Sequence, residues 1–293
     1  MADVPPEQEI LTKAKNDASV SGQIKYLSTA EAYDLWSEVY DTDGNFLQAL
    51  DTIEMKTLLP TAIRLLNADN SSKYPPWKAV DLGCGTGRNT LQLLNTDEIH
   101  EIHEIIGLEL SPKMMQIAQD ACHDNLLSKS RSRRERTTKS DTTIEQKVTF
   151  ETYDMITSKS AAPAPAKGAD LVVSTLVLEH IPTTQIFFET CANMLRPGGV
   201  LLCTNMHAQM GKISQAGFVD PKTGDKIRPV SYAHTVEDVV MAAEAAGLEL
   251  VGGDGEEGVK EVAVDETLAE RLGQRGKKWV GVTVWFGGLW KKT

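Results

Sequence analysis

Apolar residues change their spacing repeatedly along the middle of the chain, and this change predicts strands that alternate with helices. Each short apolar run is too short for a helix and is followed by residues with the spacing of an amphipathic helix. The runs cover residues 78–82, 104–110, 147–153, 169–174 and 199–205, and the helical stretches end near 94 or cover 112–127 and 182–195. Such alternation predicts an α/β fold with a doubly wound, mostly parallel sheet, whose ligand site lies at the carboxyl ends of the strands.

The regions around this core have weaker patterns. Residues 1–24 are polar and aperiodic, and we expect a flexible arm. Residues 25–70 contain two helical patterns, the first starting at Thr29 and the second covering 51–66, and we expect them to form a helical lid. Residues 71–293 would then be the core domain.

Two insertions and a C-terminal strand complete the predicted organisation. The basic stretch 129–141 lies within an insertion near 128–142, and the polar, glycine-containing stretch near 206–230 reads as a long loop over the site. Thr235 and Asp238 have the spacing of a capping box at a helix start. Alternating apolar residues after Trp279 predict a last strand.

The first predicted strand runs into a glycine turn that carries the candidate chemistry. Asp81 precedes Gly83, Gly85 and Gly87 at alternate positions, and a helix follows at once. A dinucleotide fingerprint would need a glycine where Arg88 stands, and a P-loop would need Gly-Lys-Ser/Thr. The carboxylate beside the turn would repel a pyrophosphate and suits a ligand that carries an ammonium or sulfonium group.

A second acid supports the same cofactor. Glu109 ends the next predicted strand, 22 residues beyond Gly87 (109 − 87). At about this distance an acidic residue reaches the ribose hydroxyls in a βαβ nucleotide site. S-adenosylmethionine carries an ammonium, a sulfonium and a ribose, so the two acids and the glycines together predict this cofactor, with S-adenosylhomocysteine as the product.

Several segments between residues 33 and 202 resemble one enzyme family. They read DLGCGTGRNT, IIGLELSPKMM, the acid of TYDMIT, ADLVVSTLVLEHIP and NMLRPGGVLLC. In this order they are similar to the class I S-adenosylmethionine-dependent methyltransferases, the branch with a UbiE-like domain. The resemblance implies a seven-stranded Rossmann-like sheet with an antiparallel strand near the C-terminus. The segment WSEVYDTDGNFLQALD resembles fungal small-molecule methyltransferases of natural-product pathways.

The same resemblance implies a set of cofactor contacts. These are Tyr33, Trp36, Tyr40, Asp81, Gly83, Cys84, Gly85, Thr86, Glu109, Leu110, Asp154, Met155 and Ser174. The three aromatic residues would shape the site as part of the lid, although an aromatic stripe at helical spacing is equally consistent with core packing. The glycine turn would hold the amino-acid portion of the cofactor, and Glu109 would bind the ribose. Leu110, Asp154 and Met155 would contact the adenine, and Ser174 would lie near the methyl group.

Histidines are the candidate general bases. The resemblance places His180, in LVLEHIP, opposite the reactive methyl group, where a neutral imidazole would accept a proton from the acceptor. The alternative is that His180 only fixes its loop by a hydrogen bond. His207 and His234 are alternative bases. The other histidines lack the further ligands of a metal site, so we predict no metal.

Charge and composition narrow the partners. A net charge of −11 argues against nucleic acid, and no apolar run is long enough to cross a membrane. The start of the sequence lacks a secretory pattern, so we expect a cytoplasmic protein, a monomer or homodimer, with four reduced cysteines. The sequence therefore predicts a methyltransferase that acts on nitrogen or oxygen of a small molecule. A protein or RNA methyltransferase and a non-catalytic cofactor-binding partner protein remain as alternatives.

Overall fold

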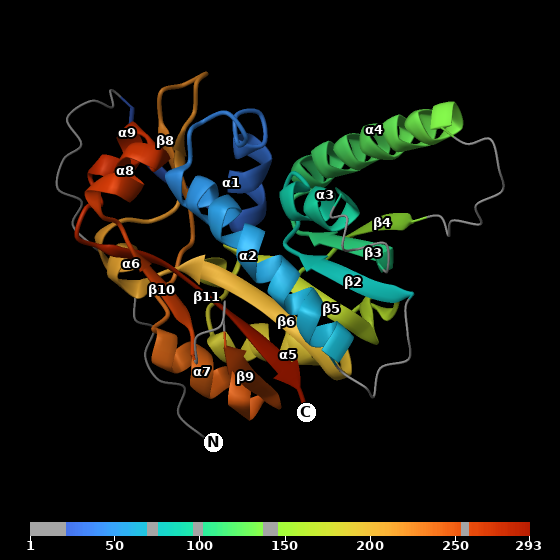
Figure 1. Ribbon diagram of the computed structural model, residues 1–293. Coiled ribbons are helices and arrows are strands. Elements are labelled where there is room, and N and C mark those ends of the chain that lie inside the picture. The colour runs from blue at the N-terminus through green and yellow to red at the C-terminus, as the bar shows by residue number, and fades with distance from the viewer. Residues whose placement is uncertain (1–21, 69–75, 96–101, 137–145, 253–257) are drawn as a thin grey trace.

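The computed structural model describes residues 22–68, 76–95, 102–136, 146–252 and 258–293 (Figure 1). Most of the predicted N-terminal arm and residues 137–141 of the basic insertion lie outside the described residues.

A central sheet of eight strands organises the molecule (Figure 1). Its first five strands are parallel, in the order β4 (Lys147–Thr152), β3 (Ile102–Glu109), β2 (Trp77–Leu82), β5 (Ala169–Thr175) and β6 (Leu195–Met206). The predicted α/β fold with a mostly parallel sheet is confirmed. The carboxyl ends of β2, β3 and β5 meet at one edge, where the motif acids lie.

The C-terminal strand is antiparallel, as expected, and it explains why the sheet has eight strands where we expected seven. β11 (Thr283–Lys292) lies against β6 along its length. On its other side, its first half pairs with β10 (Lys260–Ala263) and its second half with β9 (Leu248–Gly252). The long strand β11 therefore pairs with the two short strands β10 and β9 along the same edge.

Helices cover both faces of the sheet, so the strands are buried on both sides and read as nearly continuous apolar runs. One face packs against α2 (Phe46–Ala68), α3 (Arg88–Asn95), α4 (Pro112–Arg136) and α8 (Glu266–Leu272). The other face packs against α5 (Thr184–Met194) and α7 (Val236–Ala245). Successive β6 residues alternate between the two cores, Leu201 on one side and Leu202 on the other. Each buried leucine contributes roughly 1.5–3 kcal/mol.

A lid of mixed structure lies at the cofactor edge of the sheet. It contains α1 (Thr29–Trp36) and a small sheet in which β8 (Lys226–Pro229) lies between β1 (Ile24–Leu27) and β7 (Phe218–Val219). The rest of the expected lid does not belong to it, because α2 packs on the main sheet. α6 (Ala208–Ile213) packs against β11. Stretch 206–230 is therefore folded and is not the plain loop that we expected. The expected boundary between residues 24 and 25 runs through β1.

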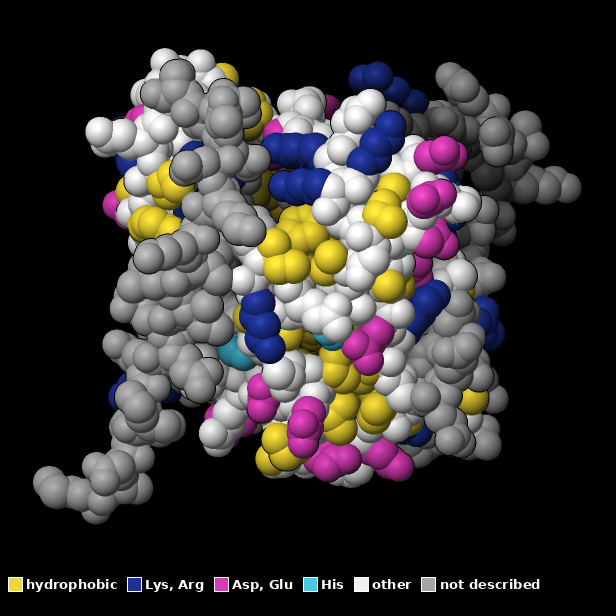
Figure 2. All heavy atoms as spheres, turned by 90° about the vertical axis from the view of Figure 1, so that its left-hand side faces the viewer, with side chains coloured by type: hydrophobic (Ala, Val, Ile, Leu, Met, Phe, Trp, Pro, Cys, Tyr) yellow, Lys and Arg dark blue, Asp and Glu magenta, His cyan; other side chains and the backbone are white. Residues whose placement is uncertain are grey.

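The lid has its own small core and an outer face that is partly apolar. Trp36 stacks on Phe218, with ring centroids 5.2 Å apart. Ile24, Tyr26 and Val219 expose about half of their surface. Figure 2 faces the left-hand side of Figure 1 and shows hydrophobic side chains gathered there among charged ones.

The basic insertion also differs from the expected loop. α4 continues through residues 129–136 instead of ending near 127, because Lys, Arg, Ser and Glu all tolerate a helix. Lys129 donates a hydrogen bond to the carbonyl oxygen of Leu94. Among the described residues, no helix combines the length and apolarity needed to cross a membrane. All four cysteines are buried and unpaired.

Candidate active site

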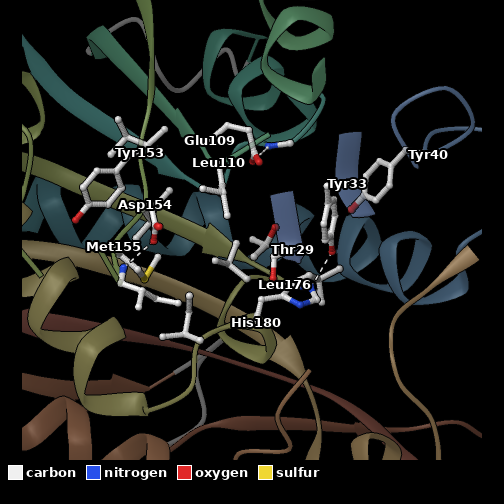
Figure 3. Close-up of a pocket in the computed structure, with 18 residues that line it drawn as sticks. Thr29, Tyr33, Tyr40, Glu109, Leu110, Tyr153, Asp154, Met155, Leu176 and His180 are labelled. Atoms are coloured by element: carbon white, nitrogen blue, oxygen red, sulfur yellow. Dashed lines mark hydrogen bonds between the residues drawn. The ribbon is translucent and has the colours of Figure 1, made fainter. Parts of the chain in front are cut away.

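A cavity of about 730 Å³, including the part open to solvent, lies between α1 and the carboxyl ends of β2, β3 and β5 (Figure 3). The segments that follow these strands supply most of its wall, and α1 with Tyr40 closes one side. This is the edge at which doubly wound sheets bind their ligands.

The glycine turn after β2 forms the floor of the cavity. Gly83 has a φ of 74°, and a Cβ atom there would come within 2.2 Å of a methyl carbon of Val177. Gly85 has a φ of 55°, and a Cβ atom there would meet nothing within 4 Å. The first glycine therefore permits close packing of the turn, and the second leaves backbone bare beside open space, as a closely held ligand requires.

Glu109 lies at the rim of the cavity and is tied to that turn. Its carboxylate accepts hydrogen bonds from the backbone N–H of Gly85 at 2.9 Å and of Ser111 at 2.8 Å. Burial raises its pKa, and the backbone hydrogen bonds oppose that rise. A carboxylate has about four acceptor positions, so Glu109 can still accept from a ribose hydroxyl.

The remaining lining fits a nucleoside with positive charge. Leu110, Tyr153, Asp154 and Met155 form the wall beyond β3 and β4, with an apolar surface for a base (Figure 3). Asp154 accepts from the backbone N–H of Ile156 at 2.9 Å, which fixes the loop. The lining residues described for this cavity include no Lys or Arg. The site thus fits S-adenosylmethionine and would repel a polyphosphate.

Four predicted cofactor contacts lie behind the turn instead of lining the cavity. The Asp81 side chain is only 1% exposed and accepts from the Thr90 hydroxyl at 2.6 Å, and burial raises its pKa to about 6. Ser174 donates to the carbonyl oxygen of Leu82. Cys84 is also buried, and Thr86 donates to a carboxylate oxygen of Asp41 at 2.9 Å. That these four residues contact the cofactor stays a prediction. In this structure, the hydrogen bonds of Asp81, Ser174 and Thr86 support the turn.

The aromatic residues Tyr33, Trp36 and Tyr40 have two different roles. Tyr33 and Tyr40 line the cavity (Figure 3). Trp36 does not, because its ring packs in the lid core and its indole N–H donates to Asp43 at 2.9 Å. Trp36 is therefore a residue of the lid core, which was the alternative interpretation of the aromatic stripe.

The environment of His180 fixes its tautomer. Nδ1 lies 2.8 Å from the carbonyl oxygen of Val230, which can only accept, so Nδ1 carries the proton. Nε2 is then the acceptor for the Tyr33 hydroxyl, also at 2.8 Å. Burial lowers the pKa of His180 to about 4, so the ring is neutral at pH 7. His180 both lines the cavity and holds the lid.

The other candidate bases face elsewhere. His207 Nδ1 accepts from the backbone N–H of Gln209, and its Nε2 lies 2.8 Å from a Glu261 carboxylate oxygen. His234 Nε2 donates to the carbonyl oxygen of Ile181, and burial lowers its pKa. Neither lines the cavity, so the geometry favours His180. Among the described residues, no group of three or more His, Cys, Asp or Glu side chains could hold a metal ion.

Two features escaped the sequence reasoning. Leu176 lines the cavity with a φ of 58°, which is unusual for a residue with a side chain and is typical of functional sites. Glu179 is 4% exposed, and its Oε1 lies 3.6 Å from Nε2 of His180. The acid inside the apolar run LVLEHI is the signal from which Glu179 could have been found.

Comparisons with known proteins bear on the family and the fold. Residues 80–203 match the family model described as a methyltransferase domain. An uncharacterized methyltransferase of Emericella nidulans is 48% identical over 275 residues, covering 90% of this chain and 91% of the relative. A ubiquinone biosynthesis O-methyltransferase of Rhizobium etli is 23% identical, covering 71% of this chain and 72% of the relative.

A solved structure shows the same fold. It is a Haemonchus contortus phosphoethanolamine N-methyltransferase 2 in complex with S-adenosyl-L-methionine, with a TM-score of 0.50 and 14% identity. The match covers 89% of this chain and 60% of that one.

Proposed function

This chain belongs to the class I S-adenosylmethionine-dependent methyltransferases, and we propose that it methylates a nitrogen or oxygen atom of a small molecule in secondary metabolism. The observation that carries the proposal is the single cavity that joins the cofactor edge to the Tyr33–His180 pair under α1 (Figure 3). The relatives named for O-methylation and the neighbour named for N-methylation support either acceptor atom.

When bound, the cofactor supplies a methyl group on a positively charged sulfur that is already activated for displacement. The chain's residues contribute position and a dry surrounding, and well-oriented proximity alone is worth about 7–11 kcal/mol. Glu109 and the bare backbone of Gly85 would hold the cofactor. Leu176 and Ile181 line the acceptor side with apolar surface.

The acceptor proton has a defined place to go. The Nε2 lone pair of His180 already accepts the Tyr33 hydroxyl proton, so the acceptor meets the pair and not a free imidazole. A proton given up by the acceptor would arrive at the Tyr33 oxygen as Tyr33 passes its own proton to Nε2.

The alternatives predict different behaviour. An RNA acceptor would meet a net charge of −11 and a cavity whose described lining lacks Lys and Arg, so its phosphates would be unpaired. A protein methyltransferase would act on a polypeptide and leave small acceptors unchanged. A non-catalytic cofactor-binding partner protein would bind the cofactor and transfer no methyl group.

The test has two stages. Calorimetric titration with S-adenosylhomocysteine, and with NAD as the control, is repeated on Glu109→Ala; we expect micromolar binding of the thioether alone, lost in the variant. Transfer of labelled methyl from S-adenosylmethionine is then screened over phenols and cyclic dipeptides. Binding without transfer to any small molecule, but with transfer to protein or RNA, would replace the proposal with the corresponding alternative.

A further inference from the structure

The turn that carries His180 is held by a segment from another part of the chain. The turn is the 3-10 helix η3 (Leu178–His180), which follows β5, and the segment is the connector between β8 and α7, residues 230–234. Three hydrogen bonds of 2.7–2.8 Å join them: His180 Nδ1 to the Val230 carbonyl oxygen, the Tyr232 N–H to the Glu179 carbonyl oxygen, and His234 Nε2 to the Ile181 carbonyl oxygen. Each of the three consecutive residues 179–181 is therefore bonded to a different residue of the connector.

Only one of the three bonds depends on a side chain of the connector. Val230 and Tyr232 contribute backbone groups, whereas His234 contributes its imidazole ring. Burial lowers the pKa of His234, so the ring is neutral at pH 7, and its single proton lies on Nε2, because a carbonyl oxygen can only accept. The ring also stacks against Tyr232, with the ring centroids 6.1 Å apart. His234 therefore presents a fixed N–H donor to the turn.

The bond from His234 reaches the turn at its end. Ile181 follows η3, and its backbone, at φ −103° and ψ 128°, is extended. On the other side of His180, the N–H of Glu179 donates to the Asn205 side chain of β6 at 3.1 Å. Without the bond from His234, the turn would still be held before His180 but no longer after it.

We propose that His234 is a positioning residue for His180. Its bond to Ile181 keeps η3 in the orientation in which Nδ1 of His180 reaches the Val230 carbonyl oxygen and Nε2 faces the Tyr33 hydroxyl (Figure 3). With Nδ1 occupied as a donor, Nε2 keeps the lone pair that accepts the Tyr33 proton. This inference rests on the proposed function, which gives that lone pair its part in taking up the acceptor proton.

None of the charged or titratable groups around His180 is removed in a variant of His234. The His180 ring faces the Tyr33 hydroxyl and the Glu179 carboxyl, whose Oε1 lies 3.6 Å from Nε2. Asp238 of α7 acts on the His234 ring, which is itself neutral. A change in the titration of His180 when His234 is replaced by a neutral residue therefore reports the position of His180 and not a lost charge.

The test compares variants of His234 that differ in the N–H donor. His234→Phe keeps a ring and His234→Asn keeps a shorter amide, and neither offers a donor at the position of Nε2, whereas His234→Gln does. Each protein is labelled with ¹⁵N-histidine and titrated from about pH 8 to about pH 5, with and without S-adenosylhomocysteine. NMR of the ring nitrogens reports tautomer and protonation, and the spectrum of His180→Gln identifies the His180 signals.

The donor should decide the outcome at His180. In wild type and His234→Gln, we expect His180 to stay neutral with its proton on Nδ1 over this range, since burial holds its pKa at about 4. In His234→Phe and His234→Asn, the ring gains solvent and a second tautomer. We expect the midpoint of its titration to rise by at least about one pH unit, toward the ordinary value of about 6.5.

The controls separate the possible failures. His207→Phe removes another ring N–H donor, to Glu261 outside the cavity, and should leave His180 unchanged. Unchanged affinity for S-adenosylhomocysteine shows that a variant is folded, and either donor-free variant suffices. An unchanged tautomer and midpoint in the donor-free variants, the same rise in His234→Gln or His207→Phe, or unfolding of both donor-free variants in circular dichroism would overturn the inference. Failure of the wild type to bind S-adenosylhomocysteine or to transfer a methyl group would overturn the proposed function instead, and the ring titration would still decide whether His234 positions His180.

Discussion

At the scale of single residues, burial moves two adjacent titratable groups in opposite directions. It raises the pKa of Glu179 to about 8 and lowers that of His180 to about 4. Both side chains are therefore predominantly uncharged at pH 7, and no ion pair forms although Oε1 and Nε2 are only 3.6 Å apart.

Glu179 should make the stability of the protein depend on pH. The unfolded state ionises this carboxyl from about pH 4.3, whereas the folded state does so only near pH 8. Its stabilising contribution is complete below the unfolded pKa and is lost as pH rises toward 8, by at most about 1.4 kcal/mol per pH unit. Glu179→Gln lacks this loss. In urea unfolding, the free energy of unfolding of the variant relative to wild type should rise between about pH 5 and pH 8.

The control for that series is Glu249→Gln, at an exposed glutamate of β9. It should show a nearly constant difference from wild type over the same pH range. A constant difference for Glu179→Gln as well would show that the carboxyl is ionised inside the folded protein at neutral pH.

The two motif acids should affect cofactor binding unequally. Glu109→Gln keeps one oxygen, which cannot replace two acceptors facing the N–H groups of Gly85 and Ser111, and it places an N–H₂ group against a donor. We expect S-adenosylhomocysteine affinity to fall by at least roughly tenfold. Asp81→Asn should have the smaller effect, because its bond to Thr90 survives in an amide. Calorimetry on both variants checks this order, and a larger loss in Asp81→Asn would place Asp81 at the ligand.

At the scale of elements, α1 and the turn after it are attached to three different loops around the cavity. Tyr33 reaches His180, Asp34 accepts from the Ser111 hydroxyl at 2.5 Å and from the N–H of Lys113 at 3.2 Å, and Asp41 accepts from Thr86 in the glycine turn. Asp34 thereby also caps the start of α4. The lid and the loops that hold the cofactor should consequently open together.

Removing the Asp34 attachment tests that coupling. In Asp34→Ala, α1 loses its contact with the loop after Glu109, and we expect S-adenosylhomocysteine to dissociate several-fold faster in stopped-flow measurements. Glu38→Gln, in the turn that follows α1, is the matched control, because it breaks only an exposed ion pair with Lys222. Equal dissociation rates in both variants would mean that the lid moves independently of the loops.

Elements whose signal is local were predicted well. The Thr235–Asp238 capping box is present with both of its hydrogen bonds, and the core strands start and end within a few residues of their apolar runs. α2 starts at Phe46 and not at residue 51, because the Asn45 side chain accepts from the N–H of Leu47, a cap that we did not weigh. β1 and β8 were missed, since such short strands exist only through pairing between distant parts of the chain.

In the site too, the sequence predicts what depends on local spacing and misses what depends on distant residues. Spacing located Asp81 and Glu109 at two strand ends, but it does not determine which way a side chain turns. Glu109 faces the cavity, whereas Asp81 turns behind the glycine turn toward Thr90 of α3. The tautomer of His180 depends on Val230 and Tyr33, which only the fold brings next to it, so no sequence pattern could reveal it.

At the scale of the whole molecule, one buried carboxylate joins four elements. Asp51 of α2 is fully buried and accepts from Arg88 of α3, the Thr204 hydroxyl of β6 at 2.5 Å and the Trp285 indole N–H of β11 at 3.0 Å. The same guanidinium reaches Thr175 in the cavity wall at 3.1 Å. The network therefore links α2 and α3 to the C-terminal strand β11 and to the wall of the cavity.

Breaking this network should cost stability in a coupled way. Asp51→Asn leaves the Arg88 charge without its counter-ion, and since that guanidinium is 21% exposed we expect about 2–3 kcal/mol, below the ~3–5 kcal/mol of a fully buried pair. Arg88→Met should also destabilise by leaving the Asp51 charge alone. The double variant should cost clearly less than the sum, because it leaves neither charge unpaired. Urea unfolding of all four proteins measures the cycle; additive costs would mean that Thr204 and Trp285 alone hold the carboxylate, and that α3 is not coupled through Asp51 to the C-terminal strand.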